Sequence, residues 1–222
     1  MFEDRKDAGR QLAAALARYR DERPVILALP RGGVPVAAEV AEALEAPLDL
    51  ILVRKIGVPM QRELAMGAVV DGPEPIVVRN EDVIRATGVR PAGFDAVCRR
   101  ELAEIERRRS RYLGERPRAE LDGRVVIVID DGVATGATTR AALRAVRARH
   151  PSKLVLAVPV AAPDVLEELR AEADDLVCLE TTQSLRAIGL FYVDFRQVSD
   201  AEVMRILARI PARRRAPARP SN

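Results

Sequence analysis

Residues 124–139 read RVVIVIDDGVATGATT, and the interpretation of the whole chain starts from this stretch. The β-branched run Val125–Ile129 fits a strand that is buried on both faces. The run ends in two carboxylates, Asp130 and Asp131, and a loop of small residues then opens a helix expected over 137–149. Backbone N–H groups at the start of such a helix are unshielded and favour a bound phosphate. The stretch therefore predicts an anion site beside a pair of acids.

The pair of acids separates this loop from a plain phosphate loop. Carboxylates repel phosphate, so Asp130 and Asp131 are expected to hold something else, such as the vicinal hydroxyls of a sugar or a metal. At the end of a strand, Asp131 is also expected to be exposed and to contribute little to the core. A Walker-type nucleotide loop is excluded because no Gly-Lys-Ser/Thr follows. The alternative to a ligand site is an ordinary strand-to-helix turn with capping acids.

The segment resembles the signature of the type I phosphoribosyltransferases: a hydrophobic run, two acids, two variable residues and Ala-Thr-Gly-x-Thr. In that family the acids bind the ribose 2′ and 3′ hydroxyls of phosphoribosyl pyrophosphate, and the loop binds its 5′-phosphate. The resemblance implies that Asp130 and Asp131 hold the diol and favour the positive charge that develops on the sugar. The residues it implies for this substrate-binding loop are Gly132, Val133, Ala134, Thr135, Gly136, Ala137 and Thr138.

Two earlier loops place cations at the ends of predicted strands. Residues 24–29 (PVILAL) form a strand that breaks at Pro-Arg-Gly-Gly, and residues 48–53 (LDLILV) form another that runs directly into Arg-Lys. Ligands of open α/β sheets bind at such strand ends. In the resembled family the first of these loops binds the diphosphate, often through a non-proline cis peptide, and basic residues of the second meet the same group. The residues implied are Arg31, Gly32, Gly33, Arg54 and Lys55.

The alternatives for these two loops are a common turn and a pair of solvated charges. The spacing Arg-Lys-x-Gly-x-Pro over residues 54–59 is most similar to the adenine phosphoribosyltransferase branch. In the 6-oxopurine branch an Asp that handles a purine proton stands just before the Thr-Gly of the phosphate loop, and here that residue is Ala134. Hypoxanthine and guanine are therefore disfavoured as acceptors, and the base stays open.

Charge and length bound the domain organisation. The chain has 222 residues and a formal charge of +3, but its end, PARRRAPARPSN, holds four Arg and no acid, so removing these four leaves −1 for residues 1–210. A length of this order suits one domain. We therefore expect a single phosphoribosyltransferase-like domain over 1–210 and a basic disordered tail over 211–222, with nucleic-acid binding not favoured.

Cysteine, histidine and apolar patterns exclude other classes of protein. Cys98 and Cys178 lie far apart and the chain has a single His, which argues against a disulfide framework and a clustered metal site. No apolar stretch reaches the ~18 residues of a membrane span. Residues 1–11 lack the apolar core of a signal peptide. We therefore expect a cytoplasmic protein that does not contact membranes.

Strands and helices alternate after the two acids. Strands are expected over 153–158 and 176–179, with a helix over 162–171 between them. Such alternation predicts an α/β fold with an open parallel β-sheet flanked by helices and joined by right-handed crossovers. The resembled family has the same fold, in which a small hood covers the site.

An insertion over about 58–118 interrupts this alternation. Residues 67–70 and 76–78 predict an antiparallel hairpin, and a long helix is expected to start at Pro91. Opposite charges four residues apart, as in Glu104–Arg108, indicate that this helix has a solvated face rather than a nucleic-acid surface. The insertion occupies the place of the family's mobile loop.

The connection over 58–72 is the candidate lid of the site. It is expected to be exposed and open without ligand, and to bring Arg62 or Glu63 toward the reacting centre when both substrates bind. Glu63 is the third catalytic candidate because Ala134 cannot handle a base proton. Phe191, Tyr192 and Phe195 form an aromatic cluster for which two interpretations stand: packing, or a hood that stacks on a planar base.

The resemblance implies a phosphoribosyltransferase that releases pyrophosphate from phosphoribosyl pyrophosphate as a nitrogenous base attacks the sugar. Mg²⁺ is expected to bind mainly through substrate oxygens, with no all-protein metal site. A homodimer is the expected assembly. The alternative function is a regulatory protein that senses phosphoribosyl pyrophosphate without turnover, although no DNA-recognition motif is evident.

Overall fold

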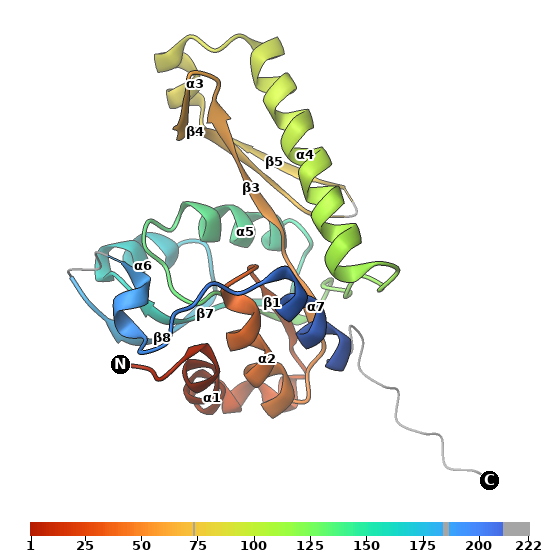
Figure 1. Ribbon diagram of the computed structural model, residues 1–222, viewed down its shortest axis with the longest axis vertical. Coiled ribbons are helices and arrows are strands. Elements are labelled where there is room, and N and C mark those ends of the chain that lie inside the picture. Colours follow the sequence, from red (N-terminus) through yellow and green to blue (C-terminus); the bar gives the residue numbers. More distant parts are fainter. Residues whose placement is uncertain (73, 184–186, 211–222) are drawn as a thin grey trace.

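The computed structural model describes residues 1–72, 74–183 and 187–210 (Figure 1). The centre of the molecule is a parallel sheet made of β1 (Val25–Ala28), β2 (Leu48–Leu50), β6 (Val125–Ile129), β7 (Lys153–Ala161) and β8 (Asp175–Thr181). Its strand order is β2-β1-β6-β7-β8, and every neighbouring pair is parallel. All residues of β1 and β6 are buried, as their hydrophobic sequences require. The predicted open parallel sheet is confirmed.

Helices cover both faces of this sheet (Figure 1). One face packs against α1 (Arg5–Ala15), α2 (Gly33–Ala43) and α7 (Asp200–Arg209), and the other against α5 (Ala137–Arg147) and α6 (Pro163–Leu169). Two short 3-10 helices, η1 (Ala17–Glu22) and η2 (Ile188–Phe191), lie in connections. Successive residues of β6 point to opposite faces of the sheet. Ile127 therefore packs in the hydrophobic core beneath α1, α2 and α7, and Val128 packs in the core beneath α5 and α6.

The strand order creates a crevice between β1 and β6. From β1 the chain passes through α2 to β2 on one side, and from β6 it passes through α5 to β7 on the other. Ligands of open α/β sheets bind outside the carboxyl ends of strands at such a reversal. Ala28 pairs with Ile129, so the two strands end at the same level and the loops that follow them begin side by side.

A second unit projects from the parallel sheet, and we call it the arm (Figure 1). It consists of β3 (Val53–Val58), β4 (Gln61–Val70), β5 (Ile76–Arg79), α3 (Glu81–Thr87) and α4 (Pro91–Leu113). The strands form an antiparallel sheet in the order β3-β4-β5. Met66, Phe94 and Ile105 belong to the same hydrophobic core as α1 and α2, so the core continues from the sheet into the arm.

The arm confirms two predictions and corrects one. The hairpin expected from 67–70 and 76–78 is the pairing of β4 with β5, and the helix expected from Pro91 is α4. The connection over 58–72 is not an open loop, because most of it is strand β4, whereas residues 59–64 are exposed as expected. β4 pairs on both sides, with β3 and β5, and these ladders satisfy the backbone groups of its paired residues. The partner strand β3 begins before the charged pair that the sequence suggested as a strand end.

No helix in the described ranges is long and apolar enough to cross a membrane. The basic tail predicted over 211–222 lies outside the described residues, as do residues 184–186 in the segment that precedes the aromatic cluster.

Candidate active site

The loops that follow β1 and β6 are in direct contact. A Cβ atom on Gly32 would lie 2.0 Å from Asp131 Oδ2, and one on Gly33 would lie 2.7 Å from the carbonyl oxygen of Ile129. Any side chain at either glycine would therefore displace the loop that carries the acids. The Pro30–Arg31 peptide bond is cis, as the resemblance implied for this loop. The structure thus brings together the two glycines and the two acids that the sequence singled out.

The two acids have different environments. Asp130 keeps some solvent contact, and its Oδ1 accepts a hydrogen bond from the backbone N–H of Asp131 at 2.9 Å. Burial raises the pKa of the Asp130 carboxyl well above its ordinary value, and the charge of Asp131 raises it further. Asp131 is only 8% exposed, so the expectation that this strand-end carboxylate is exposed and contributes little to the core is wrong.

Asp131 is held by residues far away in the sequence. Arg5 Nε donates to its Oδ2 at 2.8 Å, and the hydroxyl of Tyr192 donates to its backbone oxygen at 2.7 Å. The Arg5 guanidinium lies over the ring of Phe195 at 3.8 Å and donates to the backbone oxygen of Arg196 at 2.9 Å. The N-terminal helix and the segment after η2 therefore position the second acid.

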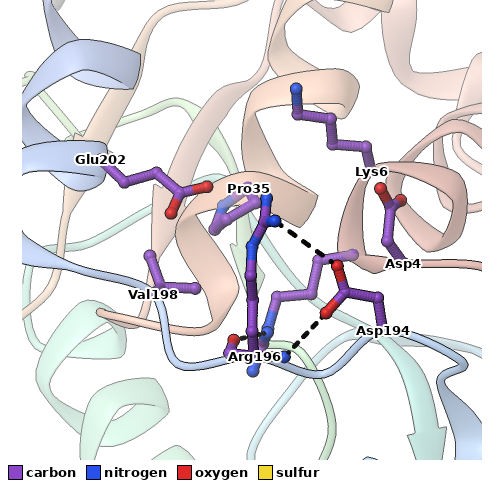
Figure 2. A pocket seen from close by; sticks show the side chains of 8 residues that line it. Asp4, Lys6, Pro35, Asp194, Arg196, Val198 and Glu202 are labelled. Atoms are coloured by element: carbon purple, nitrogen blue, oxygen red, sulfur yellow. Dashed lines mark hydrogen bonds and ion pairs between the residues drawn. The ribbon is translucent and has the colours of Figure 1, made fainter.

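A small surface pocket lies beside this contact (Figure 2). Arg196 pairs there with Asp194 at 3.7 Å, and Asp4, Lys6 and Glu202 also line the opening. Its volume of about 40 Å³ is too small for a sugar phosphate. The pocket therefore gives no reason to place the substrate here.

The loop between β6 and α5 has the form of an anion site. Gly136 has φ +72° and caps α5, and within the described part of the chain no side-chain hydrogen bond caps the start of that helix. A Cβ at Gly136 would lie 2.9 Å from a methyl group of Val165, so glycine is required here for both conformation and space. Residues 134, 135, 137 and 138 are exposed, whereas residues 132 and 133 are buried. The helix N-terminus is open to a phosphate.

A cavity of about 60 Å³ opens between the strand ends and the arm. Asp130 and Thr138 line it from the β6 loop and the start of α5, and Arg54 lines it from the arm. The complete lining is Leu29, Pro30, Leu52, Val53, Arg54, Arg108, Asp130 and Thr138. One cavity is therefore shared by an acid, the predicted phosphate loop and a predicted cation.

The predicted cations do not all reach this cavity. Arg54 and Lys55 are consecutive in β3 and point to opposite faces. Lys55 pairs with Glu63 at 3.0 Å, and the structure does not bring it to the cavity. Arg54 lies at the cavity but is held by Glu101 of α4 at 2.8 Å. Arg31 lies 3.5 Å from Asp200, the first residue of α7.

Several residues of this site escaped the sequence interpretation. Arg108 lines the cavity from α4, and Arg111 pairs with Asp200 at 2.8 Å beside Arg31. A hydrogen bond from Tyr112 lowers the pKa of Asp200, and nearby arginines lower it further. The signal that could have found Arg108 is its spacing, since it lies three residues after the inward-facing Ile105 and four before Tyr112.

The family of the chain follows from a comparison of its sequence with family models. The model of the phosphoribosyl transferase domain matches residues 2–196, which include both strand-end loops and the arm. The chain belongs to this family. The predicted resemblance to phosphoribosyltransferases and the predicted fold class are therefore confirmed, whereas the likeness to the adenine branch stays a prediction.

Relatives extend this assignment. Two curated proteins from strains of Mycobacterium tuberculosis, each named "Putative phosphoribosyl transferase", are 48% identical over 209 residues, which make up 94% of this chain and 47% of theirs. The chain spans about half the length of the curated relatives it matches. The crystal structure of TT1426 from Thermus thermophilus is 43% identical, with a TM-score of 0.83, and the match covers 95% of this chain and 99% of that one.

The structure also shows where Glu63 and the aromatic cluster lie in this member of the phosphoribosyl transferase family. The side chain of Glu63 is fully exposed on β4 and pairs with Lys55, so a catalytic role would require the arm to move and stays a prediction. Tyr192 is buried between the rings of Phe2 and Phe195, at 5.4 Å and 4.9 Å between centroids. For Tyr192 the packing interpretation of the aromatic cluster therefore holds.

Proposed function

We propose that the chain binds phosphoribosyl pyrophosphate with Mg²⁺ and transfers the phosphoribosyl group to a ring nitrogen of a base, releasing pyrophosphate. The observation that supports this most directly is one cavity shared by Asp130, Thr138 and Arg54. It combines an acid for hydroxyls, an uncapped helix N-terminus for a phosphate and a cation for a second anion. Family membership points to the same chemistry.

The proposed reaction exchanges one bond for another at the anomeric carbon. The bond from this carbon to the diphosphate oxygen breaks, a bond to the base nitrogen forms, and that nitrogen loses its proton. Positive charge builds on the sugar and negative charge on the leaving group, so fixed charges around them lower the barrier. Asp130 and Asp131 would face the sugar hydroxyls, residues 134–138 the 5′-phosphate, and Arg31 and Arg54 the diphosphate.

The donor set fits a magnesium ion that arrives with its substrate. Mg²⁺ prefers six oxygen ligands and usually keeps waters and substrate phosphates among them. Asp130 and Asp131 are oxygen donors of this kind, and among the described residues no group of three or more His, Cys, Asp or Glu is placed to hold a metal. The ion would neutralise charge on the departing diphosphate.

The cavity must widen to admit this substrate. Its volume of about 60 Å³ is well below the 300–1,000 Å³ typical of small-molecule sites. Arg54 is paired with Glu101, a buried carboxylate of the arm, so a diphosphate that binds Arg54 would replace this carboxylate. Substrate binding is therefore expected to shift α4 and β3 relative to the parallel sheet.

The decisive experiment measures pyrophosphate release from phosphoribosyl pyrophosphate and Mg²⁺ across a panel of purine and pyrimidine bases. Release that depends on one base supports the proposal and identifies the acceptor. Tight binding by calorimetry without release for any base would support the alternative of a sensing protein. Absence of binding would contradict both. In the same assay, full turnover by Glu63→Ala would exclude Glu63 as the acid that handles the base proton.

The predicted homodimer is a separate proposal. Sedimentation equilibrium of the full chain tests it directly, because a monomeric mass at the concentration used for the activity assay would contradict it.

A further inference from the structure

Helix α4 carries one stripe of side chains toward the candidate active site. Glu101, Ile105, Arg108 and Tyr112 recur at intervals of four, three and four residues, which places them on one face of the helix. Glu101, Ile105 and Tyr112 are buried, so this face is turned inward. Arg108 therefore reaches the cavity from an inward face, although its neighbours in sequence suggested a solvated one.

The charge pattern makes Arg108 available to a ligand. Its Nε pairs with Glu104 at 2.7 Å, and Glu104 also pairs with Arg107 at 2.8 Å. The hydrogen bonds from Arg107 and then Arg108 lower the pKa of Glu104 to about 2, so this carboxylate stays ionised. If Arg108 turned toward a ligand, Glu104 would keep Arg107 as its partner. The exchange leaves no carboxylate unpaired and costs little.

The position of Arg108 indicates which group of the proposed substrate it would bind. In the cavity it lies with Arg54 of β3, which the proposed function assigns to the diphosphate, and with Pro30, the neighbour of the similarly assigned Arg31. Arg31 belongs to the same edge, since it pairs with Asp200 at 3.5 Å, and Asp200 accepts a hydrogen bond at 2.7 Å from Tyr112, which lies one turn of α4 after Arg108. A planar guanidinium binds two phosphate oxygens at once, which a lysine cannot do.

We propose that Arg108 binds the diphosphate of the sugar substrate, so that the arm supplies a guanidinium to the leaving group in addition to Arg31 and Arg54. This inference rests on the proposed function and adds to it a residue outside the signature loops. It also gives α4 a role in substrate recognition beyond packing.

The test compares Arg108→Gln with Arg107→Gln in the full chain. The control is matched, because both arginines pair with Glu104, but the Arg107 side chain is 59% exposed and does not line the cavity. Calorimetry with Mg²⁺ measures the affinity for phosphoribosyl pyrophosphate, inorganic pyrophosphate and ribose 5-phosphate. Arg108→Gln should weaken the first two by roughly tenfold or more and leave ribose 5-phosphate within about twofold. Arg107→Gln should change none of the three.

Equal pyrophosphate affinities in the two variants would overturn the assignment of Arg108. An equal loss for ribose 5-phosphate and pyrophosphate in Arg108→Gln would overturn it as well, because the diphosphate would then not be the group that Arg108 binds. A wild-type chain that binds pyrophosphate but not the sugar diphosphate would contradict the proposed function. In that case the pyrophosphate affinities of the two variants would still decide whether Arg108 binds a diphosphate. A wild-type chain that binds neither would overturn both.

A second pair of variants tests the proposal if Arg108→Gln does not fold. If Arg108→Gln lacks the far-ultraviolet circular dichroism of the wild type, Arg108→Lys and Arg107→Lys replace the glutamine pair. Lysine keeps the charge but loses the two-oxygen geometry. Pyrophosphate should then bind severalfold more weakly to Arg108→Lys alone, and unchanged binding would overturn the proposal.

Discussion

Arg5 and Asp131, which are 126 residues apart in sequence, form an ion pair in which Nε donates to Oδ2 at 2.8 Å. Both side chains are almost completely removed from solvent, with 11% and 12% exposed. A carboxylate that is both buried and oriented can present its remaining oxygen in a fixed direction. The first helix of the chain is therefore part of the candidate active site, although it lies far from the signature loop in sequence.

Arg5→Gln should destabilise the protein by roughly 3 kcal/mol, because it leaves Asp131 buried without its countercharge and removes the stacking on Phe195. Urea unfolding measures the change. Arg10→Gln is the control: its side chain is 60% exposed and pairs with Asp7 at 3.5 Å, so less than about 0.5 kcal/mol is expected. Equal midpoints for the two variants would show that the buried pair contributes nothing.

Asp131→Asn should weaken binding of phosphoribosyl pyrophosphate by roughly tenfold or more, since it removes the charge that accepts hydrogen bonds from a sugar hydroxyl. Because Asp131 is paired with Arg5, the variant should also lose stability. Calorimetry and urea unfolding separate the two effects. In a double-mutant cycle with Arg5→Gln the stability losses should not add, and additive losses would contradict a direct interaction.

Gly136→Val should remove ligand binding and destabilise the protein by about 2–4 kcal/mol, because valine resists the positive φ and its Cβ would crowd Val165. Gly88→Val is a matched control in the arm: φ is +63°, but nothing lies within 4 Å of a Cβ placed there. It should cost about 1–2 kcal/mol and leave ligand affinity intact. Loss of binding in both variants would point to global unfolding as the cause.

Asp130 should make stability fall as pH rises. Its pKa is raised in the folded state by burial and by Asp131, so the folded protein holds this proton more tightly than the unfolded chain. Below the unfolded pKa of about 3.9 both states are protonated and the group contributes nothing. Above that value the free energy of unfolding declines until the folded pKa is passed. Asp130→Asn should reduce this decline in urea unfolding above about pH 4, and an unchanged slope would contradict it.

The same group links ligand binding to protons. A cationic metal or the hydroxyls of a sugar favour ionised Asp130, so binding should release a proton into solution. Calorimetry in two buffers with different ionisation enthalpies measures this release. Asp130→Asn should abolish the buffer dependence, whereas a dependence that persists in this variant would assign the proton to another group.

Part of the site could be predicted because the residues that form it lie close together in the sequence. Asp130, Gly136 and Thr138 lie within nine residues, where a buried strand ends and a helix starts, and such a local arrangement favours the predicted anion site. The hairpin of β4 with β5 was predictable for the same reason. The strand β3 was not, because its charged start, Arg54 and Lys55, reads as a strand end until the pairing with β4 is known.

By itself, the sequence determined the alternation of strands and helices and the positions of the acids, the glycines and the predicted phosphate loop, because hydrophobic period and backbone freedom are properties of short segments. Only the tertiary structure decided which charges meet. The order β2-β1-β6 brings Gly32 against Asp131, the twofold alternation of β3 turns Arg54 inward and Lys55 away, and α4 adds Arg108. The pairing of Arg5 with Asp131 likewise belongs to the tertiary structure, because the two residues are 126 apart in sequence and meet only when the first helix packs beside the β6 loop.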